Sequence, residues 1–176
     1  AKKGWTLEYA SDVSESVTDM AAEEGLQFDF SKAVVANTFN AHRLLQFAKT
    51  QGKGSELKEL LLSGYFTEGK NIDSAATLVE LGALAGLDKT ETEKVVADKM
   101  LFAKDVNANI AEARELGING VPFFVLDRKY GISGAQETKV FTKSLEKAFA
   151  EWKSEQGVNA LETTEGAVCT PGGACD

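Results

Sequence analysis

The 176-residue sequence contains only two cysteines, two prolines and one histidine. Both cysteines, Cys169 and Cys175, lie within the last eight residues. A disulfide-stapled secreted scaffold spreads its cysteines through the fold, so the sequence argues against that class and favours a cytoplasmic protein. Two cysteines and one distant histidine also fall short of the four ligands of a structural zinc site, and we expect no metal.

Long hydrophobic runs are also absent, and the 27 acidic residues outnumber the 19 lysines and arginines. No apolar segment approaches the length that crosses a membrane. The formal net charge is −8, whereas phosphate contacts require a basic face, so we expect neither nucleic acid nor a membrane as a partner. The hydrophobic content of 43% with 26% charged residues is that of a globular domain with its own core.

Most of the chain has the apolar spacing of amphipathic helices. Polar residues with N-cap character precede these segments, and glycines follow them. The spacing predicts inward-facing side chains that include Met20, Ile110, Leu116, Leu145 and Trp152. We predict helices that begin at Thr6, Asn37, Ser55, Asp73 and Asp88, a long helix that ends at Gly117, and a last helix over residues 138–153.

The period changes from helical to extended at residues 121–126, and a turn and a second strand at residues 130–133 complete a hairpin. Phe123 and Phe124 are predicted to be core residues. Pro122 stands where proline is tolerated, at the first residue of a strand. If the bond from Val121 to Pro122 is cis, the backbone groups of Val121 are available to a partner outside the fold. A cis-proline turn with only a folding role is the other interpretation.

This hairpin is too small to be stable alone, because a two-stranded sheet needs further strands or packing layers. The sequence offers no other convincing strand. We therefore expect either that strands of the sheet are missing from this sequence or that a homodimer completes the sheet.

Four segments resemble the DsbA/FrnE-like thiol-disulfide oxidoreductases. Leu-Gly-Ile-Asn-Gly-Val-Pro-Phe-Phe at 116–124 and Tyr-Gly-Ile-Ser-Gly-Ala-Gln at 130–136 resemble their cis-proline hairpin. Asn-Thr-Phe-Asn-Ala-His-Arg-Leu-Leu at 37–45 and Tyr-Phe-Thr-Glu-Gly-Lys at 65–70 resemble their helical insertion. The resemblance implies an α/β, thioredoxin-like (DsbA-type) fold with a large helical insertion. It implies an insertion domain at 1–99 and the C-terminal half of the thioredoxin-like domain at 100–155. The remainder is rich in Gly, Thr and Glu and has no periodicity, which predicts a flexible, cysteine-containing tail at 156–176.

The resemblance also implies a function, disulfide exchange on protein or peptide thiols and disulfides, with no cofactor. In the family a Cys-x-x-Cys precedes the insertion, and this sequence has none. We therefore expect a fragment without its N-terminal strand-helix-strand unit, inactive or weakly active by itself. Val121 and Pro122 would bind the substrate backbone. Cys169 and Cys175 form a candidate accessory redox pair, with adventitious oxidation of tail thiols as the alternative.

Two other functions remain open. The same superfamily contains glutathione-dependent isomerases and transferases of the 2-hydroxychromene-2-carboxylate isomerase and kappa types, in which Asn37 or His42 would line the substrate pocket and glutathione would be the cofactor. His42 is otherwise expected to pack at a domain interface. A peptide-binding or chaperone-like module that uses Val121 is the non-enzymatic alternative.

Overall fold

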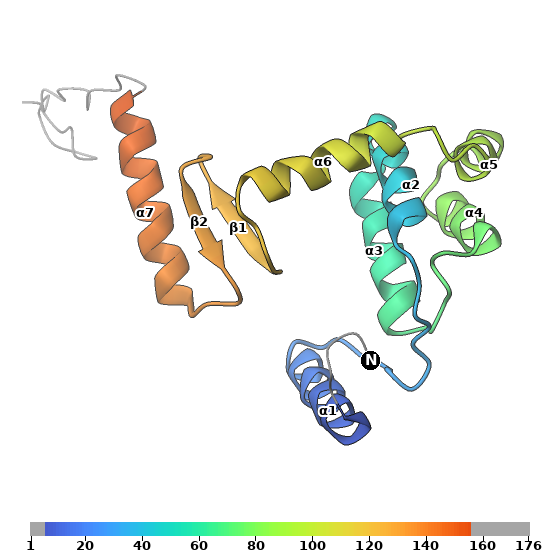
Figure 1. Cartoon of the computed structure of the whole chain (residues 1–176), viewed down its shortest axis with the longest axis horizontal. Coiled ribbons are helices and arrows are strands. Elements are labelled where there is room, and N and C mark those ends of the chain that lie inside the picture. Colours follow the sequence, from blue (N-terminus) through green and yellow to red (C-terminus); the bar gives the residue numbers. More distant parts are fainter. Residues whose placement is uncertain (1–5, 156–176) are drawn as a thin grey trace, which may run out of the picture. The chain divides into compact units, whose positions relative to one another are not determined.

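The computed structural model describes residues 6–155, which form seven helices and one two-stranded sheet (Figure 1). The chain divides into two compact units, Ala1–Ala113 and Arg114–Asp176. The boundary after residue 99 that the family resemblance implies stays a prediction. No helix within the described residues is long and apolar enough to cross a membrane.

The first helix, α1 (Leu7–Glu23), begins where the sequence predicts. The Thr6 side chain accepts a hydrogen bond from the Tyr9 amide at 3.1 Å, the N-cap interaction that such a residue provides. The predicted inward orientation of Met20 is wrong, because its side chain is 63% exposed. The reason is that no other helix or strand of the described chain packs against α1.

Four further helices build the hydrophobic core of the first unit. Leu44, Leu57 and Leu78 are completely buried there, and each contributes about 1.5–3 kcal/mol relative to an exposed side chain. The second helix packs against each of the other three. The helices are α2 (Phe39–Thr50), α3 (Gly54–Phe66), α4 (Ala75–Leu84) and α5 (Lys89–Ala97).

Three helix starts differ from the prediction by one or two residues, and one of them is that of α3, whose N-cap is Lys53 and not Ser55. Asp73 does not cap α4, because Ser74 takes that position and its hydroxyl accepts from the Thr77 amide at 3.5 Å. Asn37 precedes the N-cap of α2, and its Oδ1 accepts from the Phe39 amide at 2.9 Å. At the starts of α4 and α2 adjacent polar residues compete for the same orphan amides, and sequence alone does not rank them.

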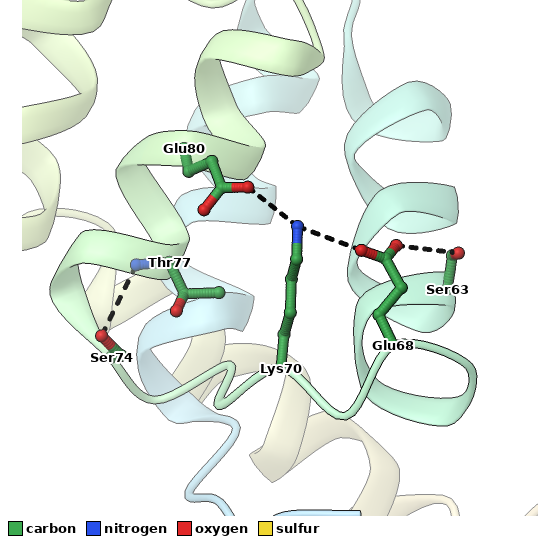
Figure 2. A network of polar contacts seen from close by, with 6 residues as sticks. All are labelled: Ser63, Glu68, Lys70, Ser74, Thr77 and Glu80. Atoms are coloured by element: carbon green, nitrogen blue, oxygen red, sulfur yellow. Dashed lines mark hydrogen bonds and ion pairs between the residues drawn. The ribbon is translucent and has the colours of Figure 1, made fainter. Parts of the chain in front are cut away.

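Lys70 holds the loop between α3 and α4. Figure 2 shows its ammonium group between two carboxylates, 3.1 Å from Glu68 and 2.8 Å from Glu80. Glu68 also accepts from the Ser63 hydroxyl at 3.3 Å, which links the loop back to α3. The hydrogen bonds to Glu80 and Glu68 raise the pKa of Lys70, so this lysine stays charged wherever both carboxylates are ionised.

Arg43 is the buried charge of the first unit, with only 1% of its surface exposed. Its Nε donates to the Leu101 carbonyl at 3.1 Å, and one terminal nitrogen donates to the Val95 and Asp98 carbonyls. These three carbonyls belong to the end of α5 and the turn that follows it. Burial lowers the pKa of the Arg43 guanidinium, although arginine stays protonated in proteins. Arg43 therefore serves as the C-terminal cap of α5.

The contact between α4 and α5 depends on the absence of a side chain at Gly82. A Cβ there would lie 2.7 Å from Thr92 Cγ2. We predict that Gly82→Ala destabilises the chain by about 1–2 kcal/mol, since overpacking costs about 1–3 kcal/mol and the gain in helix propensity offsets up to about 1 kcal/mol. Urea unfolding of the purified chain measures this change.

Two variants control that prediction. Thr92→Ser removes Cγ2 and keeps the hydroxyl that donates to the Asp88 carbonyl, so it should restore most of the stability lost in Gly82→Ala. Gly64→Ala, also within a helix, meets only ordinary contacts at 3.6 Å and should be neutral or stabilising. Equal effects of the two glycine substitutions would contradict the packing argument.

The second unit contains the hairpin. Strand β1 (Phe123–Leu126) pairs antiparallel with β2 (Tyr130–Ser133), in a register that places Phe124 opposite Ile132. Helix α6 (Ala103–Glu115) belongs to the first unit except for its last two residues, and α7 (Thr138–Glu155) follows the hairpin. The Phe124 and Phe141 rings meet edge to face at 4.9 Å, which attaches α7 to the sheet.

Several predicted core residues of these elements are exposed. Phe124 is 40% exposed despite its contact with α7. Phe123 is half-buried because its ring lies across Gly131, where a Cβ would come within 2.8 Å. The exposed fractions of the residues predicted to face inward are 39% for Ile110, 44% for Leu116, 52% for Leu145 and 44% for Trp152.

Candidate functional site

Val121 and Pro122 form an exposed loop immediately before β1. The peptide bond between them is cis, and the Val121 side chain is 91% exposed. The Pro122 carbonyl accepts from the Gly134 amide at 2.9 Å, which fastens this loop to the end of β2. The N–H and C=O of Val121 have no hydrogen-bond partner among residues 6–155. The loop therefore fixes the position of the Val121 N–H and C=O and leaves both accessible to a binding partner.

The outer edge of β1 continues this open backbone. Residues that bond to a partner strand alternate along an antiparallel pair, and Pro122 and Phe124 occupy the positions that face β2. Phe123 and Val125 therefore direct their backbone groups away from β2. Within the described part of the chain, no strand pairs with that edge. Such an edge accepts an added strand.

Helix α7 supports the hairpin from the second strand. The Tyr130 hydroxyl donates a hydrogen bond to Glu151, and Lys147 lies over the Tyr130 ring with its Nζ 4.6 Å from the centroid. The hydrogen bond to the Glu151 carboxylate raises the pKa of Tyr130, so the phenol keeps its proton at neutral pH. These contacts fix β2, and through the ladder they fix β1 and the loop before it.

The other predicted site residues lie apart from this hairpin in the chain. His42, on α2, is exposed and contributes to the wall of an apolar cavity of about 310 Å³ in the first unit. Asn37 does not line the cavity, and its side-chain Oδ1 accepts a hydrogen bond from the Phe39 amide. Cys169 and Cys175 lie outside the described residues. The described part of the chain contains no cysteine and no cluster of three potential metal ligands.

The cavity residues that the sequence did not predict include Lys58 and Leu62, which are one helical turn apart on α3. Their spacing is visible in the sequence. However, an exposed lysine and leucine at positions i and i+4 are typical of any surface helix, so the pattern carries no specific signal.

A hairpin of this kind, preceded by a cis proline and backed by a helix, defines the class of thioredoxin-like domains. The model of the DsbA-like thioredoxin domain family matches residues 8–146, and the chain belongs to that family. The predicted resemblance and the predicted thioredoxin-like fold with a helical insertion are confirmed.

The crystal structure of a probable DsbA oxidoreductase from Streptomyces coelicolor is similar to this chain. The two share 38% sequence identity and superpose with a TM-score of 0.81, over 100% of this chain and 73% of that one. Among curated protein sequences, none matches this chain.

Proposed function

We propose that this chain provides the substrate-binding part of an oxidoreductase that exchanges disulfides with protein substrates. The observation that carries the proposal is the unpaired backbone of Val121, beside the open edge of β1. An extended substrate segment would accept a hydrogen bond from the Val121 N–H and donate one to its C=O, as in recognition by strand addition. Family membership supports this role for the loop.

The exchange itself requires a thiolate. Attack on a substrate disulfide forms a bond between the attacking sulfur and one substrate sulfur, while the other substrate sulfur leaves as a thiolate. A second enzyme cysteine then displaces the reduced substrate and becomes half of an enzyme disulfide. We propose that a Cys-x-x-Cys unit outside these 176 residues supplies both sulfurs, with Cys169 and Cys175 as an accessory pair.

Binding to the Val121 loop is testable on the chain as it stands. The probe is an insulin B-chain peptide with S-methylated cysteines, titrated into the isotope-labelled chain and followed by amide chemical shifts. We expect the largest shifts at residues 120–126, and at least tenfold weaker binding when the peptide amide that pairs with Val121 is N-methylated. Equal binding of the two peptides would overturn strand addition.

Val121→Ala separates backbone from side-chain recognition. Because the side chain is 91% exposed, we expect the free energy of unfolding to change by less than about 0.5 kcal/mol. Peptide affinity should stay within about threefold, because the proposed contacts use backbone groups that alanine retains. A tenfold loss of peptide affinity in a chain of unchanged stability would show that the valine side chain, and not the backbone, reads the substrate.

Reduction of insulin by dithiothreitol tests the chemistry of the chain alone. We propose that it adds at most a weak acceleration, which disappears in the Cys169→Ser/Cys175→Ser variant. An acceleration that survives both substitutions would contradict a thiol mechanism, because the sequence contains no other cysteine. Binding of glutathione without any peptide binding would instead favour the isomerase or transferase alternative.

A further inference from the structure

The largely apolar cavity of the helical unit has the size of a ligand site. It lies between α2 and α3, has Ile72 from the loop after α3 on its wall, and has a volume of about 310 Å³. Leu45 and the rings of Tyr65 and Phe66 contribute to its wall. An apolar cavity of about 150 Å³ is large enough for benzene, so this one accommodates roughly ten to twelve carbon atoms.

Lys58 gives the cavity wall a positive charge. No aspartate or glutamate lines the cavity, although the chain as a whole carries a formal charge of −8. Lys58 forms no ion pair with any described residue, whereas Lys53 and Lys70 on either side of it in the sequence each contact a glutamate. A ligand with one negative charge would supply the missing partner of Lys58.

A neighbouring cavity indicates where the negative end of such a ligand belongs. This second cavity, of about 230 Å³, shares Leu62 and Phe66 with the first, but its wall carries Glu59 and no lysine, arginine or histidine. A carboxylate would be repelled at the Glu59 side and attracted at the Lys58 side. Leu62 and Phe66 thus border two cavities, one with a lysine on its wall and the other with a glutamate.

We infer that the cavity between α2 and α3 binds an amphipathic monocarboxylate, with its apolar body among Leu45, Leu61 and Ile72 and its carboxylate at Lys58. Such a ligand matches both the size of the cavity and the sign of its charge. The inference stands apart from the proposed disulfide exchange, because none of its residues belongs to the hairpin.

Binding of decanoate to the full chain tests the inference. Decanol and decyltrimethylammonium are the matched neutral and cationic probes, and titration calorimetry below their micelle concentrations gives the affinities. We expect one decanoate per chain and at least tenfold weaker binding of the other two probes, with amide shifts on α2 and α3. No binding of decanoate, or equal affinity for decanoate and decanol, would overturn the inference.

Two variants locate the site. Lys58→Met keeps the aliphatic stem and should weaken decanoate about tenfold without changing decanol, whereas Lys104→Met, at an exposed lysine outside the cavity, should change neither. Leu62→Trp places a large ring at a 43% exposed position of the wall and should also block decanoate. Circular dichroism verifies that each variant is folded, and unchanged decanoate binding in the folded Lys58 and Leu62 variants would refute the site.

Discussion

Arg43→Met should destabilise the chain by about 3–5 kcal/mol, the largest effect that we expect from any single substitution. Methionine has a similar length and fills the same space, but it donates no hydrogen bond. The buried carbonyl of Val95 and the part-buried carbonyls of Asp98 and Leu101 would each lose a donor, and an unsatisfied buried polar group costs about 1–3 kcal/mol. The midpoint and slope of urea unfolding give the loss.

Two further arginine variants make this prediction specific. Arg43→Lys keeps the charge but replaces the fork of five donors by one ammonium group, so it should recover only part of the stability. Arg114→Met, at an exposed arginine, should change the free energy of unfolding by less than about 0.5 kcal/mol. Hydrogen exchange in Arg43→Met should accelerate most at the end of α5. A loss no greater than that of Arg114→Met would refute the capping role.

Gly69→Ala should have the second-largest effect, about 2–4 kcal/mol. Its φ of +68° is in the left-handed region, which costs a residue with a Cβ about 1–2 kcal/mol. A Cβ would also lie 2.7 Å from the Lys32 carbonyl oxygen and 2.5 Å from Lys32 Cβ. The loop at residues 29–33 would therefore have to move away from the loop after α3, and thermal and urea unfolding measure the cost.

Gly117→Ala is the matched control for Gly69→Ala. Its φ of +70° is nearly the same, but nothing lies within 4 Å of the position of its Cβ. It should therefore show only the backbone cost of about 1–2 kcal/mol. The difference between the two variants isolates the contact with Lys32. If both variants lost the same free energy of unfolding, the contact with Lys32 would not contribute to the destabilisation by Gly69→Ala.

The hairpin shows how much of the fold is predictable from local sequence. The turn at residues 127–129 and the strand Tyr130–Ser133 lie where the change of period places them. Asp88 caps α5 as predicted, with its side chain accepting from the Glu91 amide at 2.9 Å. The cap and the turn each depend on residues three positions apart, and the strands pair residues four to ten positions apart, so local chemistry decides these features.

The candidate site was predictable only in part. The motif around Pro122 drew attention to Val121, whose exposure and unpaired backbone the structure then supplies. The sequence does not predict that Lys58 and His42 line the same cavity. They lie 16 positions apart on different helices, and only the packing of α2 against α3 places both on one wall.

By itself, the sequence determined the succession of helices, the hairpin and the family, because caps, periodicity and a multi-part motif are all local signals. Only the tertiary structure decided which apolar residues are buried. Periodicity assigns Leu145 and Trp152 to an inner face, yet both are exposed, while the arginine at position 43 is buried at 1%. Burial depends on which surfaces meet, and hydrogen bonds to three distant carbonyls make the burial of that charge possible.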